Sequence, residues 1–471
     1  MPPTTARHVS MRAPYRAAFL SSLIAASTLA GCGAAADHRP TIVLIVTDDQ
    51  RADTLWAMPT VRRELVRRGV TFTNAFVTTP LCCPSRASIL TGDYAHTTGV
   101  WQNRGPIGGF HRFNDRSTIA TWLRGAGYHT ALFGKYLNGY AGTYVPPGWE
   151  RWAAIAGAVD PYDLYYRYTL NLDGHLEQFG VQPKDYSLNV LTAEAFRYIL
   201  RTDGPLFLYF APYAPHTPVK PAPGDLNRYA GLEPRHPPSY DEPDVSDKPK
   251  WVRTLPRLSA AVRSRLAERA KRIPAALLGV DRAVNAIIEA LRLTGRLDNA
   301  MIVFTSDNGI HLGEHRWTDK GTPYDESLRV PSVVRYDPLV RTPRTDRNLL
   351  LNIDLAPTIA SIAGVRHDPV EGRSFVPLLR APAAPWRNEF SFEQAGLLGV
   401  PAYCGVRTTR FAYVRYSTGE EELYDMASDP FELENRAADP AMAPELRTLR
   451  AEQAERCRRG PPGAPSGGPS E

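Results

Sequence analysis

Five short runs of apolar and β-branched residues limit what this chain can fold into more than any other feature of its sequence. They span residues 41–46, 130–133, 206–210, 301–305 and 333–336. The first run is unbroken and rich in β-branched residues, which is typical of a strand buried on both faces, and the other four are similar. Helical patterns lie between the runs, the clearest over residues 277–291 before Gly295. This alternation predicts an α/β fold with a mostly parallel central sheet flanked by helices.

The pattern changes at about residue 388. Four strand-like pieces, separated by turns, follow at residues 389–393, 403–407, 411–416 and 422–425. They predict a small antiparallel sheet appended to the main fold. We therefore expect an α/β domain over residues 40–385, an antiparallel subdomain over residues 386–456 and a disordered tail over residues 457–471, which ends in Gly, Pro and Ser. The Pro-rich stretch at residues 234–256 is expected to cross the surface.

Composition excludes several classes of protein. Hydrophobic residues make up 43% of the 471 residues, as in a packed globular protein. After the N-terminal segment no stretch approaches 18 unbroken apolar residues, which rules out a membrane protein with several spans. The net charge of +6 includes three arginines near the N-terminus. Without them no basic stripe remains, so nucleic-acid binding is not expected.

Residues 1–31 have the pattern of an export signal. A lead with three arginines precedes an apolar run at residues 17–30, which is short for a bilayer span. The run ends in Leu29-Ala30-Gly31-Cys32, which resembles the lipobox of bacterial lipoproteins. The resemblance implies that Cys32 is acylated and attaches the protein to the outer side of a bacterial membrane through lipid alone. An ordinary cleaved signal and secretion are the alternative.

Five cysteines are too few for a fold held together by disulfides. Cys82 and Cys83 are adjacent and cannot easily pair with each other. Cys404 and Cys457 are left, and a bridge between them is possible, but spacing alone cannot show it.

The most specific motif is Cys82-Cys83-Pro84-Ser85-Arg86, followed by Leu90-Thr91-Gly92. It resembles the sulfatase signature C-x-P-S-R-x-x-x-L-T-G. The resemblance runs from Thr41 to about Asn435, with an early Asp-Asp, a Gly-Lys, an Ala-Pro-His and an Asp-Asn-Gly in the family's order, and it looks closest to N-acetylglucosamine-6-sulfatases. It implies an alkaline-phosphatase-like fold and a maturation enzyme that oxidises Cys82 to formylglycine, an aldehyde.

A hydrated aldehyde suits the hydrolysis of sulfate esters. One hydroxyl of the gem-diol attacks sulfur, and loss of the proton of the other expels sulfate and restores the carbonyl. A thiolate would instead leave a sulfur-bound adduct with no easy release. Arg86 lies one helical turn after Cys82 if the motif opens a helix, where it could hold the hydrate and offset negative charge. A helix N-terminus at this point would also favour the anion.

Metal-binding side chains follow two predicted strands. Asp48 and Asp49 come after the first strand, and Asp307 and Asn308 follow the strand at residues 301–305. Open α/β sheets bind ligands at this carboxyl edge. Three carboxylates and an amide oxygen are hard ligands that suit Ca²⁺ or Mg²⁺. The resemblance implies Ca²⁺, with Mg²⁺ possible, held by these four residues and the modified Cys82, where it would polarise a sulfate oxygen.

Three further residues match the family's sulfate-binding and acid groups. Lys135 and Lys320 correspond to its two lysines, whose compact charges suit a tetrahedral oxyanion. His216, in an Ala-Pro-His-Thr-Pro sequence, corresponds to a proton donor for the departing alcohol. These roles rest on the resemblance, because a lone lysine is normally on the surface and a lone histidine is as often structural.

The sequence departs from the family at one position. Many sulfatases place a histidine just after the Gly-Lys pair, where this chain has Leu137 and Asn138. Either Asn138 only orients a hydroxyl at the substrate, or another histidine supplies the base. His311 and His315 are the nearest candidates in sequence, and His315 is taken as a catalytic candidate.

These features predict a sulfatase, a sulfuric ester hydrolase, that acts on a sugar such as N-acetylglucosamine 6-sulfate in a glycan. The first alternative is a phosphonate monoester or phosphodiester hydrolase of the same superfamily. The second is a non-catalytic lipoprotein that binds a sulfated glycan. Aromatic residues between positions 144 and 168, among them Trp149 and Trp152, either stack on sugar rings or belong to the core. The sequence leaves the linkage, exo or endo action and the oligomeric state open.

Overall fold

The computed structural model describes residues 38–160 and 163–463. The chain divides into two units, Met1–Asp37 and His38–Glu471, and the second unit contains all the helices and strands of the described residues. The expected signal segment and Cys32 lie outside the described residues, as do residues 464–471 of the expected tail. No helix in the described ranges combines the length and the apolar character that crossing a bilayer requires.

A ten-stranded sheet forms the centre of the fold, in the order β11-β2-β10-β9-β1-β8-β4-β5-β6-β7. Its strands are β1 (Thr41–Thr47), β2 (Val70–Phe72), β4 (His129–Gly134), β5 (Arg151–Ala158), β6 (Tyr168–Leu172), β7 (His175–Gln178), β8 (Leu206–Ala211), β9 (Ala300–Ser306), β10 (Ser332–Arg335) and β11 (Arg344–Asp346). All five runs predicted from the sequence are strands of this sheet. Two short strands, β3 (Ala75–Phe76) and β12 (Leu350–Leu351), pair separately.

The middle of the sheet is parallel. Strands β9, β1, β8, β4 and β5 run in one direction, whereas β10, next to β9, and the pair β6–β7 at the far end include antiparallel neighbours. The predicted α/β class with a mostly parallel sheet is confirmed. The strand β1 is central, with β9 on one side and β8 on the other.

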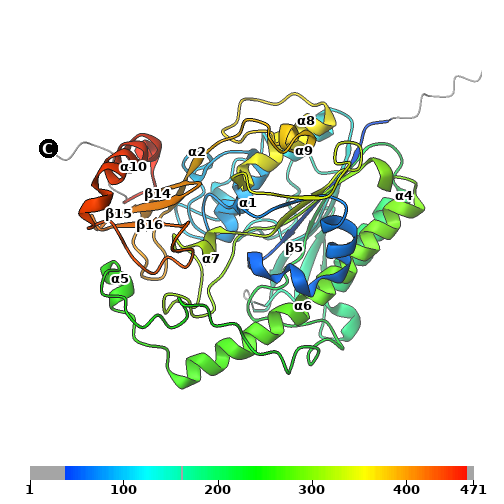
Figure 1. Ribbon diagram of the computed structural model, residues 1–471. Helices are drawn as coiled ribbons and strands as arrows, with labels where there is room; N and C mark the ends of the chain where they lie inside the picture. Colours follow the sequence, from blue (N-terminus) through cyan, green and yellow to red (C-terminus); the bar gives the residue numbers. More distant parts are fainter. Residues whose placement is uncertain (1–37, 161–162, 464–471) are drawn as a thin grey trace, which may run out of the picture. The chain divides into compact units, whose positions relative to one another are not determined.

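Helices cover both faces of the sheet (Figure 1). Along β1, Ile42, Leu44 and Val46 pack toward one layer, whereas Val43 and Ile45 pack toward the other. The first layer includes α1 (Cys82–Thr91), α3 (Ile119–Gly125) and α8 (Leu355–Ala363), and the second α4 (Ser187–Arg201) and α6 (Ala260–Leu293). The remaining helices are α2 (Ala95–Thr98), α5 (Lys250–Arg253), α7 (Asp325–Leu328), α9 (Val376–Arg380) and α10 (Ala443–Arg456).

Short helical turns connect these elements. They are η1 (Ala52–Ala57), η2 (Val61–Val66, a π-helix), η3 (Phe110–Arg112), η4 (Pro183–Asp185), η5 (Leu297–Asn299), η6 (Asn352–Asp354), η7 (Pro440–Met442) and η8 (Cys457–Arg459).

Helix α6 is much longer than the sequence pattern indicates. Its predicted apolar stripe is buried, but the helix begins at Ala260, where the Ser259 side chain caps the Val262 amide. Its first half is rich in charged residues and has few buried positions before Ile273. The N-terminal half of α6 therefore has no apolar stripe, and the sequence pattern did not predict that this half is helical.

A four-stranded antiparallel sheet follows the main sheet, in the order β13-β14-β15-β16. Its strands, β13 (Glu389–Gln394), β14 (Tyr403–Thr408), β15 (Phe411–Tyr416) and β16 (Glu421–Asp425), match the four predicted pieces closely. Helix α10 packs on it through Leu446 and Leu449. A disulfide joins Cys404 of β14 to Cys457 in η8, so residues 457–459, assigned from the sequence to the tail, are part of the folded structure.

Candidate active site at the carboxyl edge of the sheet

Four neighbouring parallel strands, β9, β1, β8 and β4, lead to one cluster of polar side chains. Asp48 and Asp49 follow β1, Asp307 and Asn308 follow β9, and Lys135 follows β4. The segment after β8 carries His216. Because parallel strands end at the same edge, residues 258 positions apart (307 − 49) meet there: the Asp49 amide donates to Asp307 Oδ1 at 3.1 Å. The expectation of a shared edge is confirmed.

The backbone at this edge adopts conformations that bring the chain close to itself. Asp49 has a left-handed conformation, with φ at 61°, which Asp tolerates better than most residues. Gly134 has φ at 123°, and a Cβ atom there would lie 2.0 Å from the Ala211 carbonyl oxygen. Only glycine fits, and the Lys135 amide then donates to that carbonyl at 2.8 Å. The glycine of the Gly-Lys pair thus sets the position of the lysine.

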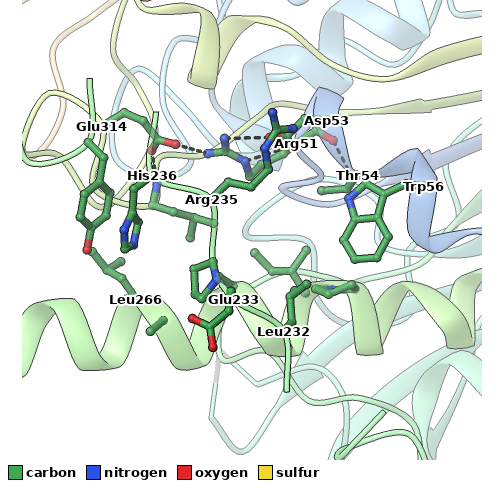
Figure 2. A pocket seen from close by; sticks show the side chains of 17 residues that line it. Arg51, Asp53, Thr54, Trp56, Leu232, Glu233, Arg235, His236, Leu266 and Glu314 are labelled. Carbon is green, nitrogen blue, oxygen red and sulfur yellow. Dashed lines mark hydrogen bonds and ion pairs between the residues drawn. The ribbon is translucent and has the colours of Figure 1, made fainter. Parts of the chain in front are cut away.

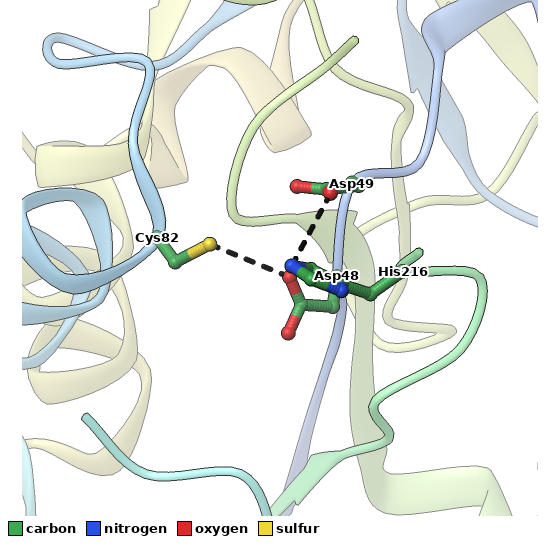
Figure 3. Close-up of side chains that lie close together, drawn as sticks. All are labelled: Asp48, Asp49, Cys82 and His216. Atoms are coloured by element: carbon green, nitrogen blue, oxygen red, sulfur yellow. Dashed lines mark hydrogen bonds and ion pairs between the residues drawn. The ribbon is translucent and has the colours of Figure 1, made fainter. Parts of the chain in front are cut away.

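Cys82 is the first residue of α1, so the N-terminus of this ten-residue helix opens at the cluster. Its side chain has no exposed surface. The Sγ atom lies 3.5 Å from Asp48 Oδ1 (Figure 3) and accepts from Lys320 Nζ at 2.9 Å. Burial raises the pKa of Cys82 to about 12, although the charges of Lys135 and Lys320 act in the opposite direction.

Arg86 lies one turn further along α1 and links two carboxylates. It is fully buried. Its Nε donates to Asp307 Oδ2 at 2.7 Å, its Nη1 to the Lys135 carbonyl at 2.9 Å, and its Nη2 is 3.5 Å from Asp48 Oδ2. The guanidinium therefore fixes the relative orientation of the carboxylates that follow β1 and β9 and offsets their charge.

The three carboxylates differ in pKa. Burial alone would raise the pKa of Asp48, but Lys135, His216 and Arg86 outweigh it and hold the pKa below its ordinary value. Lys320 similarly lowers the pKa of Asp49 against the effect of burial. The pKa of Asp307 is raised, by burial and by the charge of Asp48.

The donor set of this cluster fits a hard divalent cation. Ligand atoms of Asp48, Asp49, Cys82 and His216 lie within 4.8 Å of one another. Asn308 donates through Nδ2 to Asp49 Oδ1 at 2.7 Å, whereas its buried Oδ1 has no hydrogen-bond partner. An unpaired buried amide oxygen beside carboxylates is the arrangement expected of a ligand to Ca²⁺ or Mg²⁺. The residues present therefore fit the metal that the sequence motif implies.

His216 lies at the edge of the cluster on the segment after β8. Its Nε2 is 3.5 Å from Asp49 Oδ2 (Figure 3), and its Nδ1 hydrogen-bonds the Thr217 carbonyl. The ring packs on Tyr213 at 4.5 Å between centroids. A carbonyl can only accept, so Nδ1 carries a proton and Nε2 is the atom that gains or loses one. Burial lowers the pKa of His216 to about 4, against the pull of Asp49 and Asp48.

Lys135 and Lys320 enter the cluster from different parts of the chain. Both are nearly buried. Lys135 Nζ pairs with Asp48 Oδ2, and Lys320 Nζ pairs with Asp49 Oδ1. Lys320 lies in the loop after β9, so its position beside Cys82 depends on long-range packing.

Two predicted site residues are placed elsewhere. His315 is fully buried, but its Nδ1 bonds Glu242 Oε2 at 2.7 Å and its ring stacks on Tyr324. It belongs to a second buried group with Glu326 and Glu432, so the structure does not bring it together with Cys82. His315 and the following residue both have positive φ angles, so this loop does not continue the path of β9.

His311 bonds the Thr322 hydroxyl at 2.7 Å through Nε2. The backbone carbonyl of Asn138 accepts a hydrogen bond from the Phe110 amide, and the Asn138 backbone also hydrogen-bonds the thiol of Cys83. No hydrogen bond or ion pair joins either residue to Asp48 or Asp49 in the described part of the chain. The structure therefore holds the His311 and His315 rings in hydrogen bonds to Thr322 and Glu242, and the role of Asn138 stays a prediction.

The structure adds two residues that the sequence analysis did not name. Tyr213 packs between His216 and Lys135, whose Nζ is 5.6 Å from the ring centroid. Arg269 of α6 is close enough for Asp49 to influence its pKa. A pattern could have suggested Arg269, because three arginines recur at helical spacing in α6. The tryptophans Trp149 and Trp152, left open above, pack in the core.

Comparison with known proteins agrees with this geometry. The sulfatase family model matches residues 40–365, and the model of the N-sulphoglucosamine sulphohydrolase C-terminal region matches residues 313–459. An extracellular sulfatase of Drosophila melanogaster is 35% identical over 382 residues, which is 77% of this chain but only 34% of that protein's length. The N-acetylglucosamine-6-sulfatase of Homo sapiens is 32% identical over 77% of this chain and 68% of its own length.

The fold is also similar to that of a solved protein in complex with its substrate D-glucosamine-2-N,6-O-disulfate. That similarity has a TM-score of 0.79 at 25% sequence identity and covers 89% of this chain and 98% of the other. The family model spans most of the described residues and includes every residue of the cluster at the carboxyl edge. This chain belongs to the sulfatase family.

Proposed function

We propose that this protein is an exported sulfatase that hydrolyses a sulfate ester on a sugar. The observation that carries the proposal is the position of Cys82. It lies at the N-terminus of α1, within 3.5 Å of Asp48 and 2.9 Å of Lys320. An anion drawn to a helix N-terminus and two lysines would therefore meet residue 82 directly.

Two groups complete this site. A divalent ion held by Asp48, Asp49, Asp307 and Asn308 would supply polarisation of a sulfate oxygen, and formylglycine made from Cys82 would supply the nucleophilic oxygen. The unpaired Oδ1 of Asn308 supports the ion, with Ca²⁺ preferred and Mg²⁺ a second choice. The proposed modification of Cys82 is supported by the Cys-x-Pro-Ser-Arg motif.

The two lysines bind and orient the sulfate. In the structure each pairs with one carboxylate, Lys135 with Asp48 and Lys320 with Asp49. With a divalent ion also held by those carboxylates, each lysine would keep part of its charge for the incoming anion. Arg86 keeps Asp48 and Asp307 in place and, with both carboxylates as partners, does not turn toward the substrate.

His216 supplies the proton for the leaving alcohol. Its Nδ1–H is held by the Thr217 carbonyl, which aims Nε2 into the cluster. The pKa of His216 is low in the free protein because the ring is buried. A bound sulfate adds negative charge beside Nε2 and raises that pKa, so protonation of His216 accompanies substrate binding. Proton transfer from Nε2 then assists departure of the alcohol.

The proposed substrate is a 6-sulfated N-acetylglucosamine or a related unit of a glycosaminoglycan. Support comes from the motif pattern and from the names of the relatives, among them the human N-acetylglucosamine-6-sulfatase. The export signal, a lipid on Cys32 and a maturation enzyme that acts on Cys82 are parts of the same proposal. The proposal also includes a division at residue 385 between a catalytic domain and a C-terminal subdomain.

The test is a set of parallel rate measurements on protein made together with a formylglycine-generating enzyme and loaded with Ca²⁺. We expect release of sulfate from an aryl sulfate and from N-acetylglucosamine 6-sulfate. We also expect the Cys82 peptide to be lighter by about 18 Da, since SH₂ is lost and O gained. A higher rate on a phosphonate monoester or a phosphodiester would overturn the sulfatase assignment. Turnover by protein with an unmodified Cys82 thiol would overturn the mechanism.

A further inference from the structure

A cavity of about 490 Å³ opens beside the proposed site, between α6 and the loops that carry His216 and Lys320. One wall is Thr217–Val219, directly after His216, and another is Thr318, two residues before Lys320. The third wall is the polar half of α6. The cavity is large enough for a sugar unit.

Three arginines of α6 line this cavity: Arg265, Arg269 and Arg272. Their spacing of four and three residues puts them on one face of the helix. None of them forms an ion pair with a carboxylate within the described ranges. Glu268 also lines the cavity, but its carboxylate is 3.8 Å from Lys271. The face is therefore a concentration of positive charge without a carboxylate in ion-pair contact, although Asp49 and Asp319 act on Arg269 at longer range.

Arg269 is the most enclosed of the three. Its Nη1 donates to the Thr318 carbonyl at 3.1 Å, whereas its buried Nε has no hydrogen-bond partner. Burial lowers the pKa of Arg269 even though Asp49 and Asp319 act in the opposite direction. An enclosed guanidinium with an unused donor costs free energy unless a ligand supplies the acceptor.

A second cavity, which also has Leu266 in its lining, contains an arginine that is paired with carboxylates and serves as a comparison. It has a volume of about 340 Å³ and is lined mainly by apolar side chains. Its Arg51 pairs with Asp53 at 3.1 Å and with Glu314 at 3.0 Å (Figure 2). The positive charge of Arg51 is thus satisfied internally. The absence of such partners distinguishes the arginines of the first cavity.

The position of the first cavity relates it to one part of the substrate. His216 is proposed to protonate the leaving alcohol, so the remainder of the sugar lies on the His216 side of the sulfate. Thr217 and the two residues after it form that side of the cavity. A substituent of the sugar that lies two or more bonds away from the scissile ester would therefore face α6.

We propose that Arg265, Arg269 and Arg272 form a subsite for a second anionic group of the substrate, a sulfate or carboxylate carried by the alcohol part. This inference rests on the proposed function and narrows it to substrates with at least two negative groups. Arg269 makes the enclosed contact through Nε, and the two exposed arginines add longer-range attraction. Charge-assisted hydrogen bonds of this kind are among the stronger polar contacts.

The experiment measures binding by calorimetry in the Cys82→Ala protein with Ca²⁺ present, so that no turnover occurs. The probes are D-glucosamine 2-N,6-O-disulfate and N-acetylglucosamine 6-sulfate, which share the 6-sulfate but differ in the second charge. Adding Arg269→Gln is expected to raise Kd for the disulfate about tenfold or more and to leave Kd for the monosulfate within about twofold. The control is Arg292→Gln, because Arg292 is a cation of the same helix that pairs with Glu289; it should change neither Kd.

Equal weakening for both probes, or no change for the disulfate, would overturn the subsite. Circular dichroism and thermal melting of each variant establish that a lost affinity is not lost folding. Turnover by the matured protein with Cys82 intact is measured separately. Absence of hydrolysis of either probe would refute the proposed function, whereas normal hydrolysis without a difference between the Arg269 variants would refute the subsite alone.

Discussion

Removing the disulfide between Cys404 and Cys457 should destabilise the protein by a predictable amount. The bridge joins β14 to the segment after α10 across 53 residues. That loop contains β15, β16 and α10, whose side chains form their own small core. Without the bridge, the unfolded chain gains the freedom of an open loop of this size.

The loop-closure relation converts this length into an entropy of about 14 cal/mol/K, or about 4 kcal/mol at 25 °C. Both cysteines are nearly inaccessible, with 1% and 2% exposure, so the double variant Cys404→Ala/Cys457→Ala adds a small cost for lost packing. We expect the free energy of unfolding, from urea titration followed by far-UV circular dichroism, to fall by roughly 3–5 kcal/mol.

The control is the wild-type protein with and without a phosphine reductant. Reduction should bring the wild type to the stability of the double variant and leave the variant unchanged. In urea without reductant, alkylation should leave Cys404 and Cys457 unmodified in the wild type. A double variant within about 1 kcal/mol of the wild type would refute the reasoning from loop entropy.

Two further predictions concern the site, and a third concerns His96 and the two carboxylates that it contacts. Cys82→Ala should abolish sulfate release, whereas Cys83→Ala should retain most of it, because only Cys82 contacts Lys320 and Asp48; equal losses in initial rate on an aryl sulfate would contradict the assignment. Asn308→Leu should raise the Ca²⁺ concentration for half-maximal activity about tenfold or more by removing an oxygen ligand, and dialysis against a chelator should remove activity reversibly; an unchanged Ca²⁺ titration would exclude Asn308 as a ligand. Burial alone would lower the pKa of His96, but hydrogen bonds to Glu371 and Glu393 raise it from 6.5 to about 10. The protonated His96 therefore stabilises the folded state fully below about pH 6.5, and this stabilisation is lost as the pH rises toward 10. The free energy of unfolding should therefore fall more between pH 6 and pH 9.5 in the wild type than in His96→Gln, and parallel pH dependences would argue against the pair of carboxylates as the cause.

The buried strands were predictable because their apolar runs are continuous. Both faces of β1 contact a helical layer, so no polar residue interrupts its sequence. Strands at the edges carry no such signal: β7 is exposed along its whole length, and β2 and β3 have three and two residues. The first half of α6 was missed because its arginines face a cavity and the surface instead of an apolar core.

The ligands that directly follow strands were predictable from chain order, since a parallel sheet places the ends of neighbouring strands together. His315 shows where such reasoning fails. It follows Asp307 by only eight residues (315 − 307), yet the loop turns it toward Glu242. Lys320, five residues further on, returns to Cys82. Distances within a loop depend on its backbone angles and packing, which residue order does not specify.

The complete enclosure of Cys82 has a consequence for the order of events in the life of this protein. Its thiol has no solvent-accessible surface, and Lys320, from the loop between β9 and β10, donates to it at 2.9 Å. If Cys82 is oxidised as proposed, the maturation enzyme would have to reach the thiol before Lys320 takes up its position beside it. On this proposal, a molecule that folds with an unmodified Cys82 would stay inactive, because its buried thiol would be out of reach of a large oxidising enzyme.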